Sequence, residues 1–118
     1  MKDKEENIVL KKSFEFSLNV LDLYNKLMEV KHWDIARQVL KSGTSIGANV
    51  REAQRAVSTA DFINKLGVAL KEADETQYWF EIIDLKIMKI DNGMKKQIDE
   101  LLRLLTTIIN STKRNNNN

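Results

Sequence analysis

The sequence predicts an all-α protein, folded as an antiparallel up-down-up-down four-helix bundle. Apolar residues recur at the helical period of about 3.6 residues through four successive segments, residues 7–28, 33–57, 59–90 and 93–112. The 118 residues include no proline and four glycines, so little interrupts these helices. The segments are joined by short connections, which make consecutive helices antiparallel neighbours.

Each segment carries one apolar stripe, which is the face expected to point into the core. The stripe of the first segment consists of Phe14, Leu18, Leu21, Tyr24 and Met28, with Leu27 beside it. That of the second consists of Ala36, Val39, Leu40, Gly43, Ile46, Val50, Ala53 and Val57. That of the third consists of Phe62, Leu66, Ala69, Ala73, Thr76, Phe80, Ile83 and Ile87. That of the fourth consists of Met94, Ile98, Leu101, Leu105 and Ile108.

Local signals mark the connections between the helices. Ser58 and Asp61 have the spacing of a capping box, in which each side chain accepts a hydrogen bond from the other residue's backbone amide. Residues 91–93 (Asp-Asn-Gly) predict a turn, and residues 30–33 connect the first two helices.

The two ends of the chain are polar, and neither can bury much surface. We therefore expect residues 1–6 and 113–118 to be frayed tails of a single domain that extends over residues 1–118.

Composition argues against catalysis and metal binding. The chain has no cysteine and one histidine, His32. Metal sites in helical bundles need a Glu-x-x-His motif from each of two helices, and Glu29 with His32 forms a single copy at a helix end. Few pairs of nucleophile and base are possible. We expect no enzyme activity, no cofactor and no metal.

Charge and hydropathy indicate a cytoplasmic protein. The formal net charge is +2, which is too small to attract nucleic acid or anionic membranes strongly. No stretch approaches the roughly 18 apolar residues of a membrane span, and the N-terminus lacks an apolar signal segment. The absence of cysteine suits a reducing compartment.

Gly43 and Gly47 need an explanation, since each costs about 1 kcal/mol relative to alanine inside a helix. The residues between and after them, 44–45 and 48–49, are also small. Tight packing inside the bundle and contact with another subunit both explain this stretch. A phosphate-binding loop does not, because the stretch lacks the lysine and the preceding strand that such a loop requires.

Residues 42–53 (SGTSIGANVREA) resemble the signature of the 23S ribosomal RNA intervening-sequence protein family, also called four-helix-bundle proteins. Residues 60–66 (ADFINKL) and 69–79 (ALKEADETQYW) resemble the next two blocks of that family in the same order. The resemblance covers nearly the whole chain. Gly47 stands where many members carry proline.

The resemblance implies a four-helix bundle that assembles into a homopentameric ring, and it implies little about activity. The family is named for the location of its genes inside ribosomal RNA insertions. More basic relatives serve as accessory proteins of diversity-generating retroelements, where they bind a reverse transcriptase and nucleic acid.

Four polar residues are candidates for a buried network. Asn49 and Glu52 lie one turn apart on the second helix, and Glu72 and Glu75 lie one turn apart on the third. We expect Asn49 and Glu52 to hydrogen-bond the backbone or a neighbouring helix and so to fix the register of the helices. Glu72 and Glu75 are expected to form a surface or network pair. Ligand binding is the alternative for Asn49 and Glu52.

Basic residues form a possible nucleic-acid surface on the second helix. Arg37, Lys41, Arg51 and Arg55 share one helical face. An ordinary solvated face with salt bridges is the simpler interpretation. Residues 32–57 carry four basic and two acidic groups, whereas residues 58–91 carry four basic and seven acidic groups. These opposite charges could also pair within or between subunits.

A second apolar cluster on the third helix predicts self-association. Tyr78, Ile82 and Leu85 project from the side opposite its core stripe. An isolated bundle would leave this cluster in water, and clustered exposed apolar residues usually mark an interface. We therefore expect a homo-oligomeric, non-enzymatic interaction or scaffold protein. The alternative is a nucleic-acid-binding accessory protein, whose binding of RNA or DNA would be weak and independent of sequence.

Overall fold

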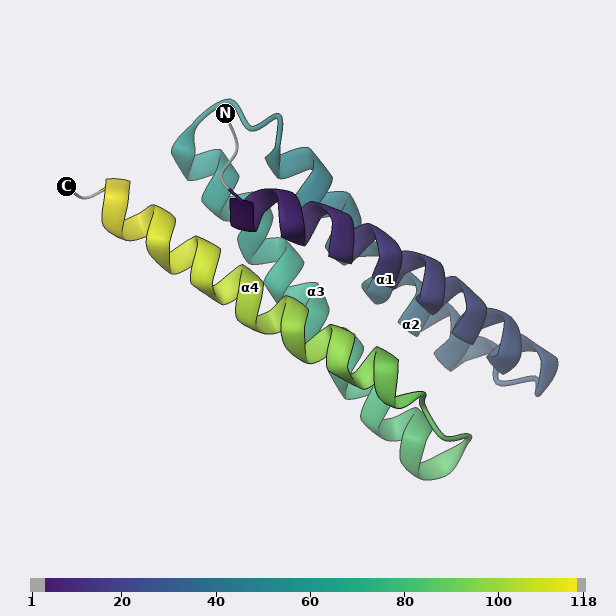
Figure 1. Ribbon diagram of the computed structural model, residues 1–118. Helices are drawn as coiled ribbons and strands as arrows, with labels where there is room; N and C mark the ends of the chain where they lie inside the picture. Colours follow the sequence, from purple (N-terminus) through teal and green to yellow (C-terminus); the bar gives the residue numbers. More distant parts are fainter. Residues whose placement is uncertain (1–3, 117–118) are drawn as a thin grey trace.

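The computed structural model describes residues 4–116, which fold into four helices. These are α1 (Lys4–Glu29), α2 (Trp33–Ala53), α3 (Thr59–Lys86) and α4 (Asn92–Asn116). The predicted fold class, an all-α four-helix bundle, is confirmed, and no strand occurs among residues 4–116. Figure 1 shows each helix running back along the one before it.

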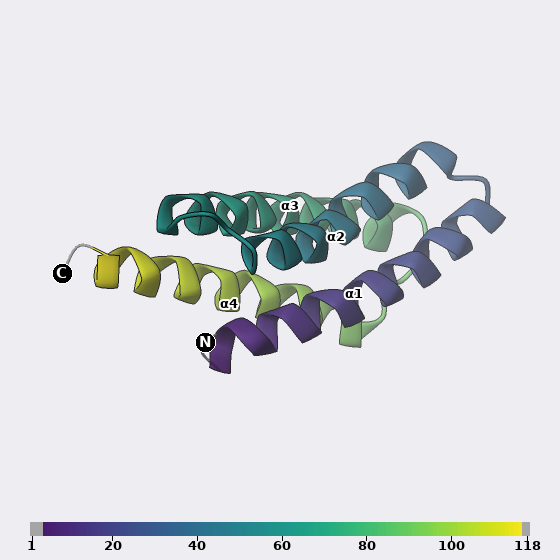
Figure 2. The ribbon, with the colours of Figure 1, turned by 90° about the horizontal axis from the view of Figure 1, so that it is seen from above.

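The helices surround one core as two layers. Around the bundle, α1 packs against α2, α2 against α3, α3 against α4, and α4 against α1. Figure 2 shows α2 and α3 in one layer and α1 and α4 in the other. Helices α1 and α3 are therefore diagonal partners, and their Phe16 and Phe80 rings meet in the core with centroids 5.9 Å apart.

The helices at both ends are longer than predicted. The tails predicted at residues 1–6 and 113–118 are helical at residues 4–6 and 113–116. Residues 1–3 and 117–118 lie outside the described part of the chain. Acidic Glu5 and Glu6 occupy the first turn of α1, and basic Lys113 and Arg114 occupy the last turn of α4. Charges of these signs stabilise helix ends by opposing the helix dipole.

Helix α2 ends earlier than predicted, at Ala53 rather than at residue 57. The backbone amides of the next three residues, 54–56, bond to carbonyls three residues back at 3.0 to 3.1 Å, which tightens the chain into turns. The predicted capping box at α3 is only half formed. Ser58 Oγ accepts from the Asp61 amide at 3.0 Å, but Asp61 Oδ2 accepts from the Val57 amide at 3.2 Å instead of the Ser58 amide.

Helix α3 also ends earlier than predicted, at Lys86 rather than at residue 90. Asp84 organises the connection that follows, because its carboxylate accepts from the Ile90 amide at 2.8 Å and pairs with Lys95 Nζ at 3.1 Å. The Ile90 hydrogen bond first, and then Lys95, hold the pKa of the Asp84 carboxyl below its ordinary value.

The connection between α1 and α2 is a Schellman motif. The His32 amide bonds to the Leu27 carbonyl, and the Lys31 amide bonds to the Met28 carbonyl, both at 3.0 Å. Lys31 occupies the position that glycine usually takes and has a φ of 67°. A non-glycine residue there costs about 1 kcal/mol or more, so this sharp turn is held by the packing on both sides of it.

The predicted core stripe of α1 is wrong at three positions, whereas its Tyr24 and Met28 pack against the core and Leu27 beside it is buried. Phe14, Leu18 and Leu21 are about half exposed, at 51%, 51% and 45%. The core instead receives a second apolar stripe, made of Val9, Phe16, Val20, Leu23 and Leu27. Both stripes have helical spacing, and the difference is that only the second faces the other three helices.

Close contact between α1 and α2 fixes this rotation of α1. A Cβ added to Gly43 would lie 2.8 Å from both methyl groups of Val20, and a Cβ added to Gly47 would lie 3.1 Å from the Ser13 carbonyl oxygen. The missing side chains thus let the α1 backbone approach α2. Both glycines pack inside the chain, as the tight-packing interpretation predicted.

Replacing Gly43 by alanine tests this contact. Gly43→Ala is expected to lower the free energy of unfolding by about 1–3 kcal/mol, because the two methyl groups of Val20 are rigidly placed and cannot swing away from the new one. The measurement is urea unfolding at one protein concentration.

Gly67 on α3 provides the matched control. No heavy atom lies within 4 Å of a Cβ added there, so Gly67→Ala should raise stability by up to about 1 kcal/mol. The double variant Gly43→Ala with Val20→Ala should lose less stability than the sum of the losses of the two single variants, because the methyl group added at position 43 no longer meets the Val20 methyl groups. Equal stability of Gly43→Ala and Gly67→Ala would contradict the close contact.

Candidate functional site

The outer face of α3 carries the apolar cluster predicted from the sequence. Leu85 is 78% exposed and Tyr78 is 56% exposed, and Ile82 between them is half-buried. The Tyr78 ring packs edge-on against Trp79, with centroids 5.2 Å apart. This contact orients the Tyr78 ring, which remains largely in solvent. We call these three residues the α3 face.

The outer side of α1 forms a second apolar surface, which the sequence analysis assigned to the core. It consists of Phe14, Leu18 and Leu21, which lie at positions i, i+4 and i+7 of the helix. The three residues of the α3 face have the same spacing. We call this set the α1 face. The signal for it was present in the sequence as a second stripe, offset by about 150° around the helix from the stripe that is buried.

A shallow groove runs beside the α1 face, between α1 and α2. It encloses about 380 Å³, and apolar side chains and small residues of α2 provide most of its lining. The lining includes Leu10, Phe14, Thr44, Gly47, Ala48 and Arg51. Arg51 extends along it, with its guanidinium carbon 5.6 Å from the centre of the Phe14 ring. Of the two glycines, Gly43 is buried and Gly47 borders the groove.

The four basic residues of the predicted nucleic-acid surface do not all share one helix. Arg37, Lys41 and Arg51 are exposed on α2, but Arg55 lies beyond its end at Ala53. Arg37 is also paired with Asp34 at 2.7 Å. The continuous basic face is therefore shorter than predicted, because the chain leaves the helical path before Arg55.

The predicted polar network is divided into separate local contacts. Asn49 donates to the Ser45 carbonyl of its own helix at 2.8 Å, and Glu52 pairs with Lys65 at 3.2 Å. Glu75 accepts from the Trp79 indole at 3.3 Å. The hydrogen bond that joins α2 to α3 in the core is a different one, between the buried hydroxyls of Ser42 and Thr76 at 2.9 Å.

The surroundings of Glu72 disfavour the ionised form of its carboxyl. Its partial burial, and then repulsion from Glu75, raise the pKa of the Glu72 carboxyl, while Lys71 and Lys41 act in the opposite direction. A raised pKa in the folded state means that the ionised form is destabilised on folding.

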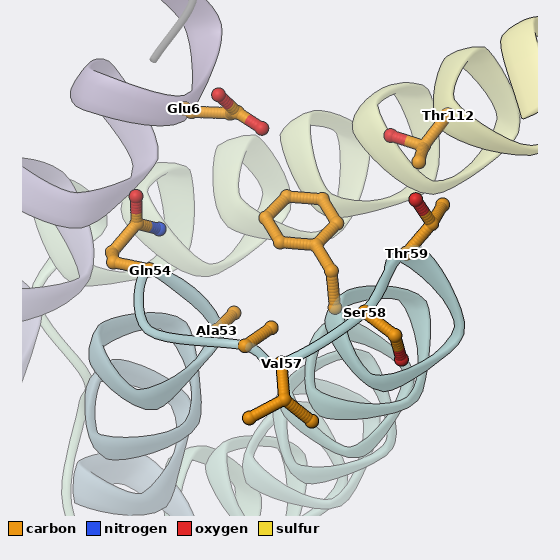
Figure 3. Close-up of a pocket in the computed structure, with 9 residues that line it drawn as sticks. Glu6, Ala53, Gln54, Val57, Ser58, Thr59 and Thr112 are labelled. Atoms are coloured by element: carbon orange, nitrogen blue, oxygen red, sulfur yellow. The ribbon is translucent and has the colours of Figure 1, made fainter. Parts of the chain in front are cut away.

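A larger hollow lies at the end of the bundle that contains the α2–α3 connection. It encloses about 940 Å³ and opens to solvent. Figure 3 shows the Glu6 carboxylate and the Thr112 hydroxyl directed toward this hollow, whereas the Val57 side chain points away from it. The Gln54 amide donates to the Val50 carbonyl at 3.1 Å, and its oxygen is buried without a partner among the described residues.

Among residues 4–116, no group of three or more histidine, cysteine, aspartate or glutamate side chains is placed to hold a metal ion. Within the same part of the chain, every helix is too short or too polar to cross a membrane.

Comparison with known proteins identifies the family. A model of the 23S rRNA-intervening sequence protein family matches residues 5–111. The chain belongs to this family. It is similar to a protein of unknown function from Bacteroides thetaiotaomicron VPI-5482, whose crystal structure is described as that of an S23 ribosomal protein family member. The two chains are 44% identical with a TM-score of 0.84, over 90% of this chain and 98% of that one. No curated protein matches the chain.

Glu72 gives a pH-dependent prediction. A carboxyl with a raised folded-state pKa contributes stability that is complete below its unfolded pKa and is lost as pH rises through the folded value. Glu72→Gln should therefore melt at a higher temperature than the unsubstituted protein at pH 7, and this difference should shrink near pH 4.

Thermal unfolding at both pH values checks this expectation. Glu15→Gln, an exposed position on α1, is the control and should melt like the unsubstituted protein at pH 7. A Glu72→Gln variant that melts below the unsubstituted protein at pH 7 would show that the Glu72 charge is stabilising.

Proposed function

We propose that this family member is a self-associating interaction protein without catalytic activity of its own. The observation that carries the proposal is the α3 face, where Tyr78 and Leu85 expose apolar surface in line with Ile82. Scattered apolar residues are common on protein surfaces, but an aligned group on one helix is typical of an interface. The α1 face is a second such group on the same protomer.

The proposed assembly is a closed ring of identical subunits that serves as a scaffold. Five subunits is the number implied by the family resemblance.

Light scattering coupled to gel filtration tests self-association. The protein should elute at about five times the 13.7 kDa chain mass. Leu85→Glu should lower this mass, because a charge would be buried in an apolar contact, and it should leave the helical circular dichroism unchanged because Leu85 is exposed in the protomer.

Val57→Glu is the matched control. Val57 is the most exposed large apolar residue among residues 4–116, at 91%, and lies in the α2–α3 connection away from both faces. This variant should keep the full mass. An unsubstituted protein that is monomeric at micromolar concentration would refute the proposed function.

Nucleic-acid binding is the second candidate, and it rests on Arg37, Lys41 and Arg51 exposed on one face of α2. With so few basic groups, any binding of RNA or DNA should be weak, independent of sequence, and steeply reduced by salt. Fluorescence anisotropy with one RNA and its scrambled control, at two salt concentrations, measures this. Equal binding of both RNAs that falls steeply with salt would favour the second candidate over the scaffold, whereas tight binding to one sequence at physiological salt would contradict this expectation.

A further inference from the structure

We infer that the α3 face of one protomer binds the α1 face and the adjoining α1–α2 groove of a second copy of this chain. This inference rests on the proposed self-association and specifies which surfaces meet. The contact joins two different surfaces, so each subunit has one neighbour on its α1 side and another on its α3 side.

The position of the two faces excludes simpler pairings. Helices α1 and α3 lie diagonally across the bundle, so their outer sides point away from each other. A dimer with a two-fold axis joins the same patch of both subunits. Such a dimer would cover one face and leave the other in water. Both faces are covered only when each subunit contacts two neighbours, which closes into a ring if the rotation is right.

The two surfaces also match in spacing and in shape. Phe14 and Leu21 are two helical turns apart, about 10 Å at the helical rise, and so are Tyr78 and Leu85. Equal spacing lets the side chains of two helices interdigitate along one line of contact. The groove beside Phe14 is made by the small residues of α2, which leaves room for a projecting side chain such as Leu85.

Charge at the edges of the two surfaces is complementary. Asp74 and Glu81 lie one turn before and one turn after Tyr78, both exposed and both without a salt bridge to any described residue. Lys11 and Arg51 flank Phe14 on the other surface and are exposed as well. The acidic Glu52, which also lines the groove, is already paired with Lys65. In the proposed contact the acidic edge of α3 meets this basic edge, which favours one orientation and disfavours contact of α3 with another α3.

A mixing experiment with two variants tests the pairing. Leu18→Glu disables the α1 face, and Leu85→Glu disables the α3 face. Both residues are exposed in the protomer, so circular dichroism should show that both variants fold. Each variant alone lacks one half of the contact and should be monomeric. An equimolar mixture retains one intact surface of each kind and should form a species of twice the 13.7 kDa chain mass.

Other results separate this inference from the proposed function. An unsubstituted protein that is monomeric would refute self-association altogether. The pairing would be refuted if the unsubstituted protein assembles and Leu85→Glu still dimerises alone. It would also be refuted if Leu18→Glu keeps the full mass of the assembly. Either result would leave self-association itself intact. A mixture that stays monomeric, although the unsubstituted protein assembles, would also refute the pairing.

Charge reversal gives an independent check of the orientation. Arg51→Glu places a negative charge against the acidic edge of α3, and it should raise the concentration at which half of the protein is assembled by at least about tenfold at low salt. Combining Arg51→Glu with Glu81→Arg should restore most of this loss. An Arg51→Glu variant that assembles like the unsubstituted protein would contradict the proposed edge contact. The control is Lys96→Glu, an exposed position on the outer side of α4, which should assemble like the unsubstituted protein.

Discussion

The close approach of α1 to α2 determines most of what this protein presents to solvent. Val20 lies against Gly43, where any side chain would collide with it. This contact fixes the rotation of α1 about its own axis. Phe16, Val20 and their stripe then point into the core, and Phe14, Leu18 and Leu21 point outward. The same approach at Gly47 leaves the groove beside Phe14. Packing inside the protomer and the shape of its outer surface therefore have one cause.

The fold could be predicted from sequence because helical periodicity and short connections leave few alternatives. The rotation of α1 could not, since two of its stripes have the same period and the choice between them depends on the other helices. The ends of α2 and α3 were also missed. Apolar residues continue past both ends, to Val57 and Ile90, although the backbone there is already turning. Periodicity reports which residues share a face, and it does not report where hydrogen bonds change partners.

The part of the candidate site that was predicted from the sequence is the α3 face, which lies on a single helix. Tyr78, Ile82 and Leu85 oppose the core stripe of α3 in any bundle, so their exposure followed from the sequence. The groove depends on the close approach of α1 and α2 at Gly43 and Gly47, and the partner of Glu52 depends on how α2 lies against α3. Glu52 reaches Lys65 across the α2–α3 contact, but Asn49 bonds to its own helix. Sequence spacing alone does not distinguish these two outcomes.

The short connections between helices have a consequence for the order of events during biosynthesis. Each helix packs against the helices next to it in sequence, so most native contacts are local, and helical domains of this kind fold within microseconds to milliseconds. Encounters between protomers at micromolar concentration are slower, at typical association rates of about 10⁵–10⁷ M⁻¹s⁻¹. The protomer is thus complete before it meets another copy, and both apolar faces exist first on a finished, monomeric fold. Rapid-mixing refolding would then show a first phase whose rate does not change with protein concentration.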